Sequence, residues 1–387
     1  MTGTLYTYAF LDDFVLLYPV YALLFSDTGL SVWQISSLFA LWSVTGMLLE
    51  IPSGAWADAV SRRLLLWLGP LLTAVGFALW VLIPSYGAFA LGFVLWGARG
   101  ALGSGALEAL IYEELERLGA ADRYTRAMGR AAAAGQLGVM AATALAGPVL
   151  AVGGYRAVGA ASVLACLLTA LTATRFPEHR SAPAAQADAG DTWTATLRGG
   201  LVEARRDRAV RGALLLVPAV TAVWGALDEY TPLLVRDTGV PDGTVPYLLV
   251  LIWVGATTGS LLAGTAERLG RGGLALVLTG SALALAAGAA IRTPAGIGLV
   301  ALAFAGFQLA TVLADARLQQ RIEGDGRATL TSVAGLGTEL TTVAVYGGYG
   351  ALVSTGTPHG TAFALFAVPY GVTALAVVAG GRTRLRR

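Results

Sequence analysis

The chain has 387 residues, of which 56% are hydrophobic and only 13% are charged, and its formal net charge is +2. Too few polar side chains remain to cover the exterior of a water-soluble domain, so the composition excludes that class and predicts a protein surrounded by lipid. All 26 cationic residues are arginine. The absence of lysine excludes a Walker A phosphate loop, which needs a Gly-Lys-Ser/Thr sequence.

Twelve apolar stretches follow one another, each near the roughly 20 residues that a helix needs to cross a bilayer. They cover residues 5–25, 33–56, 64–83, 87–111, 127–150, 155–176, 213–235, 246–266, 272–291, 296–319, 329–350 and 361–379. We therefore predict an all-α integral membrane protein of twelve transmembrane helices in two six-helix bundles, residues 1–176 and 213–387. Residues 177–212, rich in Ala, Pro, Asp and Arg, form the predicted linker.

The first stretch is predicted to stay in the protein, because Met1–Phe10 has neither a basic leader nor a small-residue cleavage site. Cys166 is the only cysteine, which excludes an intrachain disulfide. His179 and His359 fall in predicted loops, so we expect neither a histidine-based zinc site nor a serine–histidine triad. We accordingly expect no enzyme activity, no metal and no cofactor.

The arginines are distributed unequally between the two sides of the predicted membrane. One side collects 22 of the 26, three lie on the other side (Arg156, Arg236 and Arg292), and Arg99 lies within a span. Cytoplasmic loops carry the excess of positive charge, so both termini and the linker are predicted to be cytoplasmic. Lysine and asparagine, whose codons are AT-rich, are both absent. This suggests a GC-rich bacterial genome and hence the bacterial inner membrane.

A short sequence repeat suggests that the two halves are related. Asp27-Thr28-Gly29 recurs as Asp237-Thr238-Gly239, 210 positions later, and the same offset places Gly54 on Gly264. Each copy has an external Asp-Thr-Gly loop, a span, and a cytoplasmic turn with glycine and charge. Parallel repeats of this kind predict a solute site at the interface of the halves, near the middle of the membrane.

The turn after the second span resembles the signature loop of the major facilitator superfamily, Gly-x-x-x-Asp-Arg/Lys-x-Gly-Arg-Arg/Lys. The matching residues here are Gly54, Asp58, Arg62 and Arg63, whereas Ala59 and Ser61 depart from the pattern. The resemblance covers essentially the whole chain and implies the twelve-helix fold and transport by alternating access. It also implies that Asp58 lies near the start of span eleven and forms a cytoplasmic ionic latch. The alternative is a plain arginine turn that only sets topology.

Arg99 lies near the middle of span four, where a charge costs about 2.5–3.5 kcal/mol on insertion scales and therefore needs a partner or water. The resemblance implies an arginine that faces the cavity and takes part in proton coupling; the alternative is a structural ion pair. Glu108 would lie half a turn away from Arg99 on a continuous helix. We expect Glu108 to act at the cytoplasmic gate with Arg62, Arg63 or Arg130, with a proton site as the alternative.

Two pairs of adjacent acids lie inside spans, Asp12-Asp13 in span one and Asp228-Glu229 in span seven. Neighbouring carboxylates at membrane depth rarely both ionise, because desolvation and like charge favour protonation of one of them. Such a pair is a good proton carrier, and the resemblance implies that spans one, four, seven and ten line the cavity. The alternative is that the acids reach toward the cavity edge without titrating.

The remaining polar residues in the spans are Gln308 and Asp315 in span ten and Glu339 in span eleven. Gln308 is expected either to face the substrate or to hydrogen-bond between helices. Trp224 and Tyr230, which flank the span-seven acids, are expected to line the substrate cavity with Gln308 and Glu339.

Span five carries Gly135-x-x-Gly138 and Gly147-Pro148 before Gly153-Gly154, which partly resembles the glycine–proline motif of the superfamily's antiporters. This favours export. We predict a monomeric, proton-coupled exporter of a small organic compound; the alternative is a proton-coupled symporter for metabolite uptake. Its expected partners are the solute, protons and the lipid bilayer, with no nucleic acid. A membrane-embedded enzyme or a passive channel is disfavoured by the lack of a catalytic cluster and by the repeat.

Overall fold

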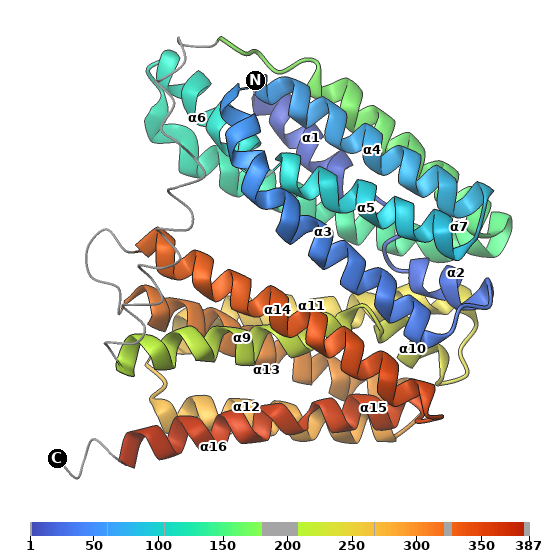
Figure 1. Ribbon diagram of the computed structural model, residues 1–387, viewed down its shortest axis with the longest axis vertical. Helices are drawn as coiled ribbons and strands as arrows, with labels where there is room; N and C mark the ends of the chain where they lie inside the picture. Colours follow the sequence, from blue (N-terminus) through green and yellow to red (C-terminus); the bar gives the residue numbers. More distant parts are fainter. Residues whose placement is uncertain are drawn as a thin grey trace. The chain divides into compact units, whose positions relative to one another are not determined.

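The computed structural model describes residues 2–59, 61–103, 105–179, 208–266, 268–320 and 327–382. Side chains at 50–59, 208–209, 327–329 and 380–382 lie outside this description. The described residues form helices and connecting turns without any β-strand, which confirms the predicted all-α class. The chain divides into two compact units, residues 1–190 and 191–387, each a bundle of helices (Figure 1).

The N-terminal unit contains the first six predicted spans. Its elements are α1 (Thr2–Asp13), α2 (Tyr21–Asp27), α3 (Val32–Ala59), α4 (Arg62–Leu82), α5 (Tyr86–Gly103), α6 (Ala106–Arg117), the 3-10 helix η1 (Ala121–Arg123) and α7 (Tyr124–Ala173). Helix α7 holds spans five and six, because Gly154 adopts φ 61° and interrupts the helix between them. Only glycine adopts such a φ at little cost, so Gly154 marks the turn between the two spans.

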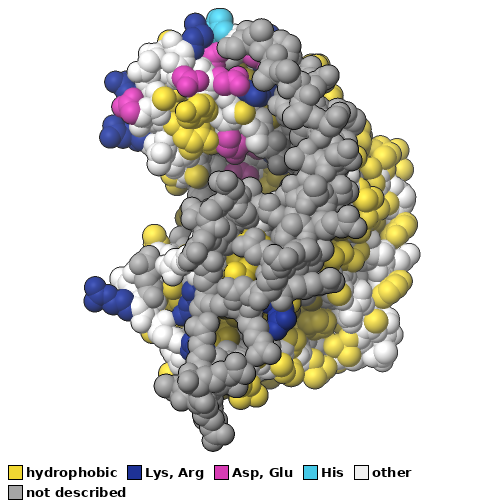
Figure 2. Space-filling view, turned by 60° about the vertical axis from the view of Figure 1, so that its left-hand side comes forward, with side chains coloured by type: hydrophobic (Ala, Val, Ile, Leu, Met, Phe, Trp, Pro, Cys, Tyr) yellow, Lys and Arg dark blue, Asp and Glu magenta, His cyan; other side chains and the backbone are white. Residues whose placement is uncertain are grey.

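The C-terminal unit contains the other six spans. Its elements are α9 (Arg208–Asp228), α10 (Thr231–Arg236), η2 (Asp242–Thr244), α11 (Val245–Ala266), α12 (Arg271–Ala290), α13 (Pro294–Gln319), α14 (Arg327–Ser354), α15 (His359–Phe366) and α16 (Val368–Arg382). Over both units, eight segments of the described residues are long and apolar enough to cross a membrane. Figure 2 shows charged side chains gathered in one region of this face, whereas much of the flank is hydrophobic.

Spans one and seven are interrupted, which corrects the prediction of continuous helices at 5–25 and 213–235. Helix α1 ends at Asp13 and α2 begins at Tyr21. Pro19 lacks an N–H donor and disfavours a helical conformation at the residue before it. The backbone N–H of Leu17 instead donates to Ser162 Oγ at 3.0 Å. Side-chain hydrogen bonds of this kind are what allow non-helical backbone at membrane depth.

In span seven, α9 ends at Asp228 and α10 begins at Thr231. Pro232 lies in the first turn of α10, where proline is favoured because its missing N–H would be unpaired anyway. The Thr231 hydroxyl donates to the Asp228 carbonyl at 2.6 Å. Both predicted acid pairs therefore lie at the point where a membrane helix breaks.

Span four is also divided. Helix α5 ends at Gly103, and α6 follows Gly105, which has φ 71°. Glu108 therefore lies on a separate helix from Arg99, and the half-turn relation expected for a continuous helix is wrong. The breaker is glycine, which alone tolerates this backbone conformation without strain.

The Asp-Thr-Gly repeat has the same local structure in both units. Gly29 and Gly239 adopt φ 88° and φ 82°, and each follows a short helix, α2 or α10. Such a φ at the end of a helix favours glycine, which explains why glycine stands at both positions. In the N-terminal unit, the hydroxyl of Tyr155 donates to Asp27 Oδ2 at 2.7 Å and so ties this loop to the start of span six.

Candidate functional site

Asp12 forms an ion pair with Arg99, so α1 and α5 are joined inside the N-terminal unit. Each side chain is only about a fifth exposed (22% for Asp12, 21% for Arg99). Asp12 lies in the last turn of α1, where the helix dipole disfavours an anion and favours a cation. Arg99 supplies that cation and offsets the cost of the carboxylate.

Asp13 has a different environment, although it is adjacent in sequence. A Cβ atom added to Gly135 of α7 would clash with Asp13 Oδ2, so this carboxylate lies directly against the glycine. Among the described residues no cation forms an ion pair with Asp13. The two neighbouring acids therefore differ, since one is paired with arginine and the other packs against helix backbone.

Asp228, at the end of α9, has no cationic partner among the described residues. The side chain of Trp253 of α11 hydrogen-bonds to this carboxyl group. Its Oδ1 is nevertheless buried without a hydrogen-bond partner, the one such side-chain atom in the described part of the chain. Glu229 is adjacent to it in the chain, and no ion pair joins Glu229 to a cation among the described residues. An ionised carboxylate with an unpaired buried oxygen is costly, and a proton or a cation would remove that cost.

The four residues predicted to line the substrate cavity lie in or next to different helices of the C-terminal unit. Gln308 donates from Nε2 to Ser260 Oγ at 2.9 Å, which joins α13 to α11 and matches the interhelical alternative. Trp224 donates from Nε1 to Thr311 Oγ1 at 3.2 Å. Tyr230 is fully buried and stacks on Tyr349 with ring centroids 3.8 Å apart, and its place in the cavity lining stays a prediction. Glu339 lies exposed on α14.

The predicted gating residues are only partly described. Gly54 and Asp58 lie on α3, but their side chains, and those of Arg327 and Thr329, are outside the description, as is the proposed latch. Arg62 pairs with Glu113 at 2.5 Å. Glu108 is exposed and forms no ion pair with Arg62, Arg63 or Arg130 among the described residues, and its part in the gate stays a prediction.

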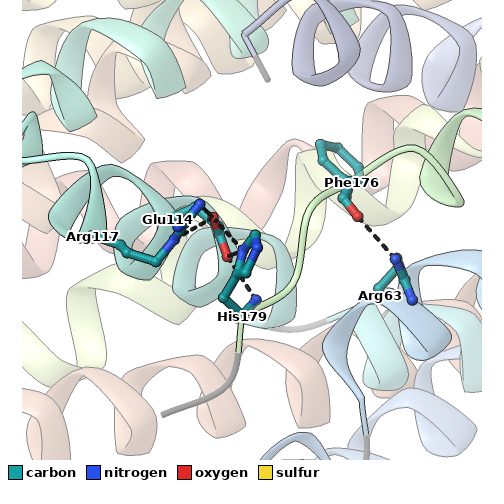
Figure 3. Close-up of polar contacts among 5 residues, drawn as sticks. All are labelled: Arg63, Glu114, Arg117, Phe176 and His179. Carbon is teal, nitrogen blue, oxygen red and sulfur yellow. Dashed lines mark hydrogen bonds and ion pairs between the residues drawn. The ribbon is translucent and has the colours of Figure 1, made fainter.

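A polar cluster that the sequence did not predict joins α4, α6 and the residues that follow α7. Arg63 Nη1 donates to the carbonyl of Phe176 at 3.3 Å, and Glu114 contacts both Arg117 and His179 (Figure 3). Burial alone would raise the pKa of Glu114, but hydrogen bonds from His179 and Arg117 outweigh it and hold that pKa below its usual range. The adjacent acids Glu113-Glu114 on a short amphipathic helix were the available signal.

Within the described residues, no group of three or more His, Cys, Asp or Glu side chains could hold a metal ion. The described side chains of the spans offer ion pairs, hydrogen bonds and carboxyl groups that can bind a proton. Charged side chains lie where helices break at membrane depth, an arrangement found in transporters.

The family model of the major facilitator superfamily matches residues 3–345. The chain belongs to the major facilitator superfamily. This membership shows that the chain is a membrane transporter and not an enzyme, and it confirms the twelve-helix fold. No curated protein sequence matches the chain at a significant level.

Several solved transporters have a similar fold. The nucleoside transporter NupG superposes with a TM-score of 0.76 at 16% identity, covering 98% of each chain. A bacterial homologue of the human lysosomal transporter Spinster, in an inward-facing and occupied conformation, has a TM-score of 0.72 at 16% identity, covering 100% of this chain and 96% of the other. A D-xylose–proton symporter has a TM-score of 0.65 at 15% identity, covering 97% and 95%. At these identities the likeness concerns the fold.

Proposed function

We propose that this transporter is a secondary active, proton-coupled exporter that exchanges a small organic compound for protons by alternating access. The observation that supports it best is Asp228, a buried carboxyl group at a helix break with one oxygen unpaired. Such a group is stable when protonated and is destabilised when it loses the proton inside the protein. It can therefore exchange a proton for a cationic solute.

The four acids fall into two groups that support different roles in this cycle. Asp12 already has Arg99 as its counter-ion. Asp13, Asp228 and Glu229 have no ion pair with a described cation, and protonation is the less costly state for such groups. Each proton that enters the cell supplies about 2.3 kcal/mol per 100 mV of membrane potential. The surplus of carboxylates favours a cationic or amphipathic solute.

Uptake by proton symport is the second candidate, since a D-xylose–proton symporter shares the fold. Export is favoured by the partial glycine–proline pattern of span five, residues 135–154. We further propose that both termini are cytoplasmic, that the protein resides as a monomer in a bacterial inner membrane, and that Asp58 with Arg62 and Arg63 contributes to the cytoplasmic gate.

The direction of an imposed pH gradient separates the two candidates. Purified protein would be screened by thermal shift against organic cations, nucleosides, pentoses and short peptides, and a stabilising compound would be added to the solution outside proteoliposomes. Exchange for protons predicts that an acidic interior drives solute uptake, whereas symport predicts that an acidic exterior does so. No response to either gradient would contradict proton coupling.

A further inference from the structure

Residues 174–179 follow α7 and lie at one end of the N-terminal unit. At this end α4 begins and α6 ends. Phe176 is buried to 1% exposure, and its ring packs edge-on against Tyr8 of α1 with centroids 5.5 Å apart. Tyr8 in turn donates from its hydroxyl to the carbonyl of Leu66 of α4 at 3.3 Å. The segment is thereby anchored by one aromatic side chain to the hydrophobic core formed by α1, α4, α6 and α7.

Glu178 attaches this segment to the first turn of α4. Its Oε1 accepts the backbone N–H of Arg62 at 2.7 Å, and its Oε2 accepts the hydroxyl of Ser61. The Ser61 hydroxyl oxygen also accepts the N–H of Leu64 at 3.1 Å and caps the helix. A carboxylate is favourable at this end because the first N–H groups of a helix have no partner within it.

His179 attaches the same segment to α6 through Glu114 (Figure 3). Glu114 Oε1 accepts the backbone N–H of His179 at 2.8 Å and lies 3.0 Å from its Nδ1. Glu114 Oε2 accepts from Nε and Nη2 of Arg117 at 3.2 and 3.1 Å. The carboxylate is only 3% exposed, so its oxygens depend on these donors rather than on water.

We propose that Phe176, Glu178 and His179 form a clasp that holds α4 and α6 against α1, and that protonation of His179 tightens it. When Nδ1 carries a proton on a charged ring, its hydrogen bond to Glu114 becomes charge-assisted and stronger. Histidine is the side chain whose charge changes between about pH 5 and pH 8. The clasp would therefore close more firmly when the solution at this end of the protein is acidic.

The charges around His179 are consistent with this response. Glu114 and Arg117 face it from α6, Arg63 of α4 donates to the backbone of Phe176, and Glu178 precedes it. Nearby, Arg62 pairs with Glu113. Hydrogen bonds hold the pKa of Glu114 below its usual range, so this carboxylate remains available as the acceptor when His179 gains its proton.

The clasp also reaches the proposed coupling site. Tyr8, which contacts Phe176, lies one helical turn before Asp12 on α1. Loosening the clasp would free the helix that carries the Asp12–Arg99 ion pair. Only this consequence rests on the proposed function, because the clasp itself is a structural claim about the N-terminal unit.

Hydrogen–deuterium exchange of the purified protein in nanodiscs tests the clasp without any solute. We expect Glu114→Gln to accelerate exchange in residues 174–179 by at least about tenfold, since the backbone N–H of His179 loses its hydrogen bond to a charged carboxylate. Glu116→Gln is the matched control, because Glu116 lies exposed on the same helix. It should leave that exchange unchanged. Equal exchange in the two variants would overturn the clasp.

Two further variants test separately the contact of Glu178 with α4 and the response of His179 to pH. Glu178→Gln should accelerate exchange of residues 61–65, where the Arg62 amide is its partner. In the wild type, protection of residues 174–179, corrected for the intrinsic effect of pH, should be greater at about pH 5.5 than at about pH 8. His179→Gln should abolish this difference. If the difference persists in His179→Gln, His179 is not the sensor, whatever the outcome of the transport assays.

Discussion

Asp12 and Asp228 are both carboxylates at a helix break, but of the two only Asp12 pairs with a cation among the residues that the structure describes. The sequence predicted both acids and Arg99 as candidates, because charged side chains inside apolar stretches are conspicuous. It did not predict which acid Arg99 would contact, since that depends on how α1 packs against α5. The same dependence explains why the sequence did not predict that Tyr230 stacks on Tyr349.

The Asp12–Arg99 pair should show strong coupling in a double-mutant cycle. Asp12→Asn and Arg99→Gln each leave a charge at membrane depth without its partner, so we expect each to lower unfolding stability by about 1–3 kcal/mol, less than for a fully buried pair. The double variant should lose less than the sum of the two. Thermal unfolding midpoints in detergent would measure this, and additive losses would contradict the pairing.

Glu114 should make the free energy of unfolding depend on pH in the acidic range. Its pKa is lower in the folded protein than in the unfolded chain, so its contribution is fully present above the ordinary glutamate pKa of about 4.3 and is lost as the pH falls through the folded pKa. Wild type should therefore be more stable than Glu114→Gln at neutral pH, and the gap should shrink below about pH 4. Unfolding midpoints across that range check this, with Glu116→Gln showing no such trend.

Glycine allows pairs of helices to approach closely in both units. A Cβ at Gly138 would lie 2.3 Å from the Phe10 carbonyl oxygen, and one at Gly259 would lie 2.0 Å from that of Ala305. Gly135-x-x-Gly138 therefore serves the packing of α7 against α1, beside its likeness to an antiporter motif. Small residues at such contacts are typical of membrane helices, but the sequence did not identify the partner helix.

Gly259→Ala should push α11 away from α13. We expect a loss of about 1–3 kcal/mol or more, the usual cost of overpacking, because the clash is with backbone that cannot turn aside. Gly264→Ala on the same helix is the matched control, since nothing lies within 4 Å of a Cβ there. Its unfolding midpoint should equal or exceed that of wild type. Similar midpoints for both variants would contradict the close packing.

The breaks in spans one, four and seven are element-scale features that hydropathy could not reveal. An apolar stretch has the same mean hydropathy whether its helix is continuous or interrupted. Pro19, Gly105 and Pro232 were visible in the sequence, but proline and glycine also occur inside intact helices here, as at Pro70 and Pro218. Which of them breaks a helix depends on whether neighbours such as Ser162 can satisfy the freed backbone groups.

At the scale of the whole molecule, the sequence was most informative. Twelve apolar stretches and the signature turn between spans two and three predicted the fold that the family match confirms. Lipid imposes this regularity, because each span must satisfy its own backbone hydrogen bonds. The clasp of Phe176, Glu178 and His179 was not predicted, since charged residues that follow a span resemble a solvated surface until their partners are known.

The central claim is that carboxylates at the helix breaks couple transport to protons. The most direct test compares proteoliposomes containing wild type, the double variant Asp12→Asn/Asp13→Asn, and the double variant Asp228→Asn/Glu229→Gln, each under an imposed pH gradient with a solute that stabilises the protein. We predict that at least one double variant loses pH-driven accumulation but retains solute exchange. Full proton-driven accumulation by both double variants would contradict the claim.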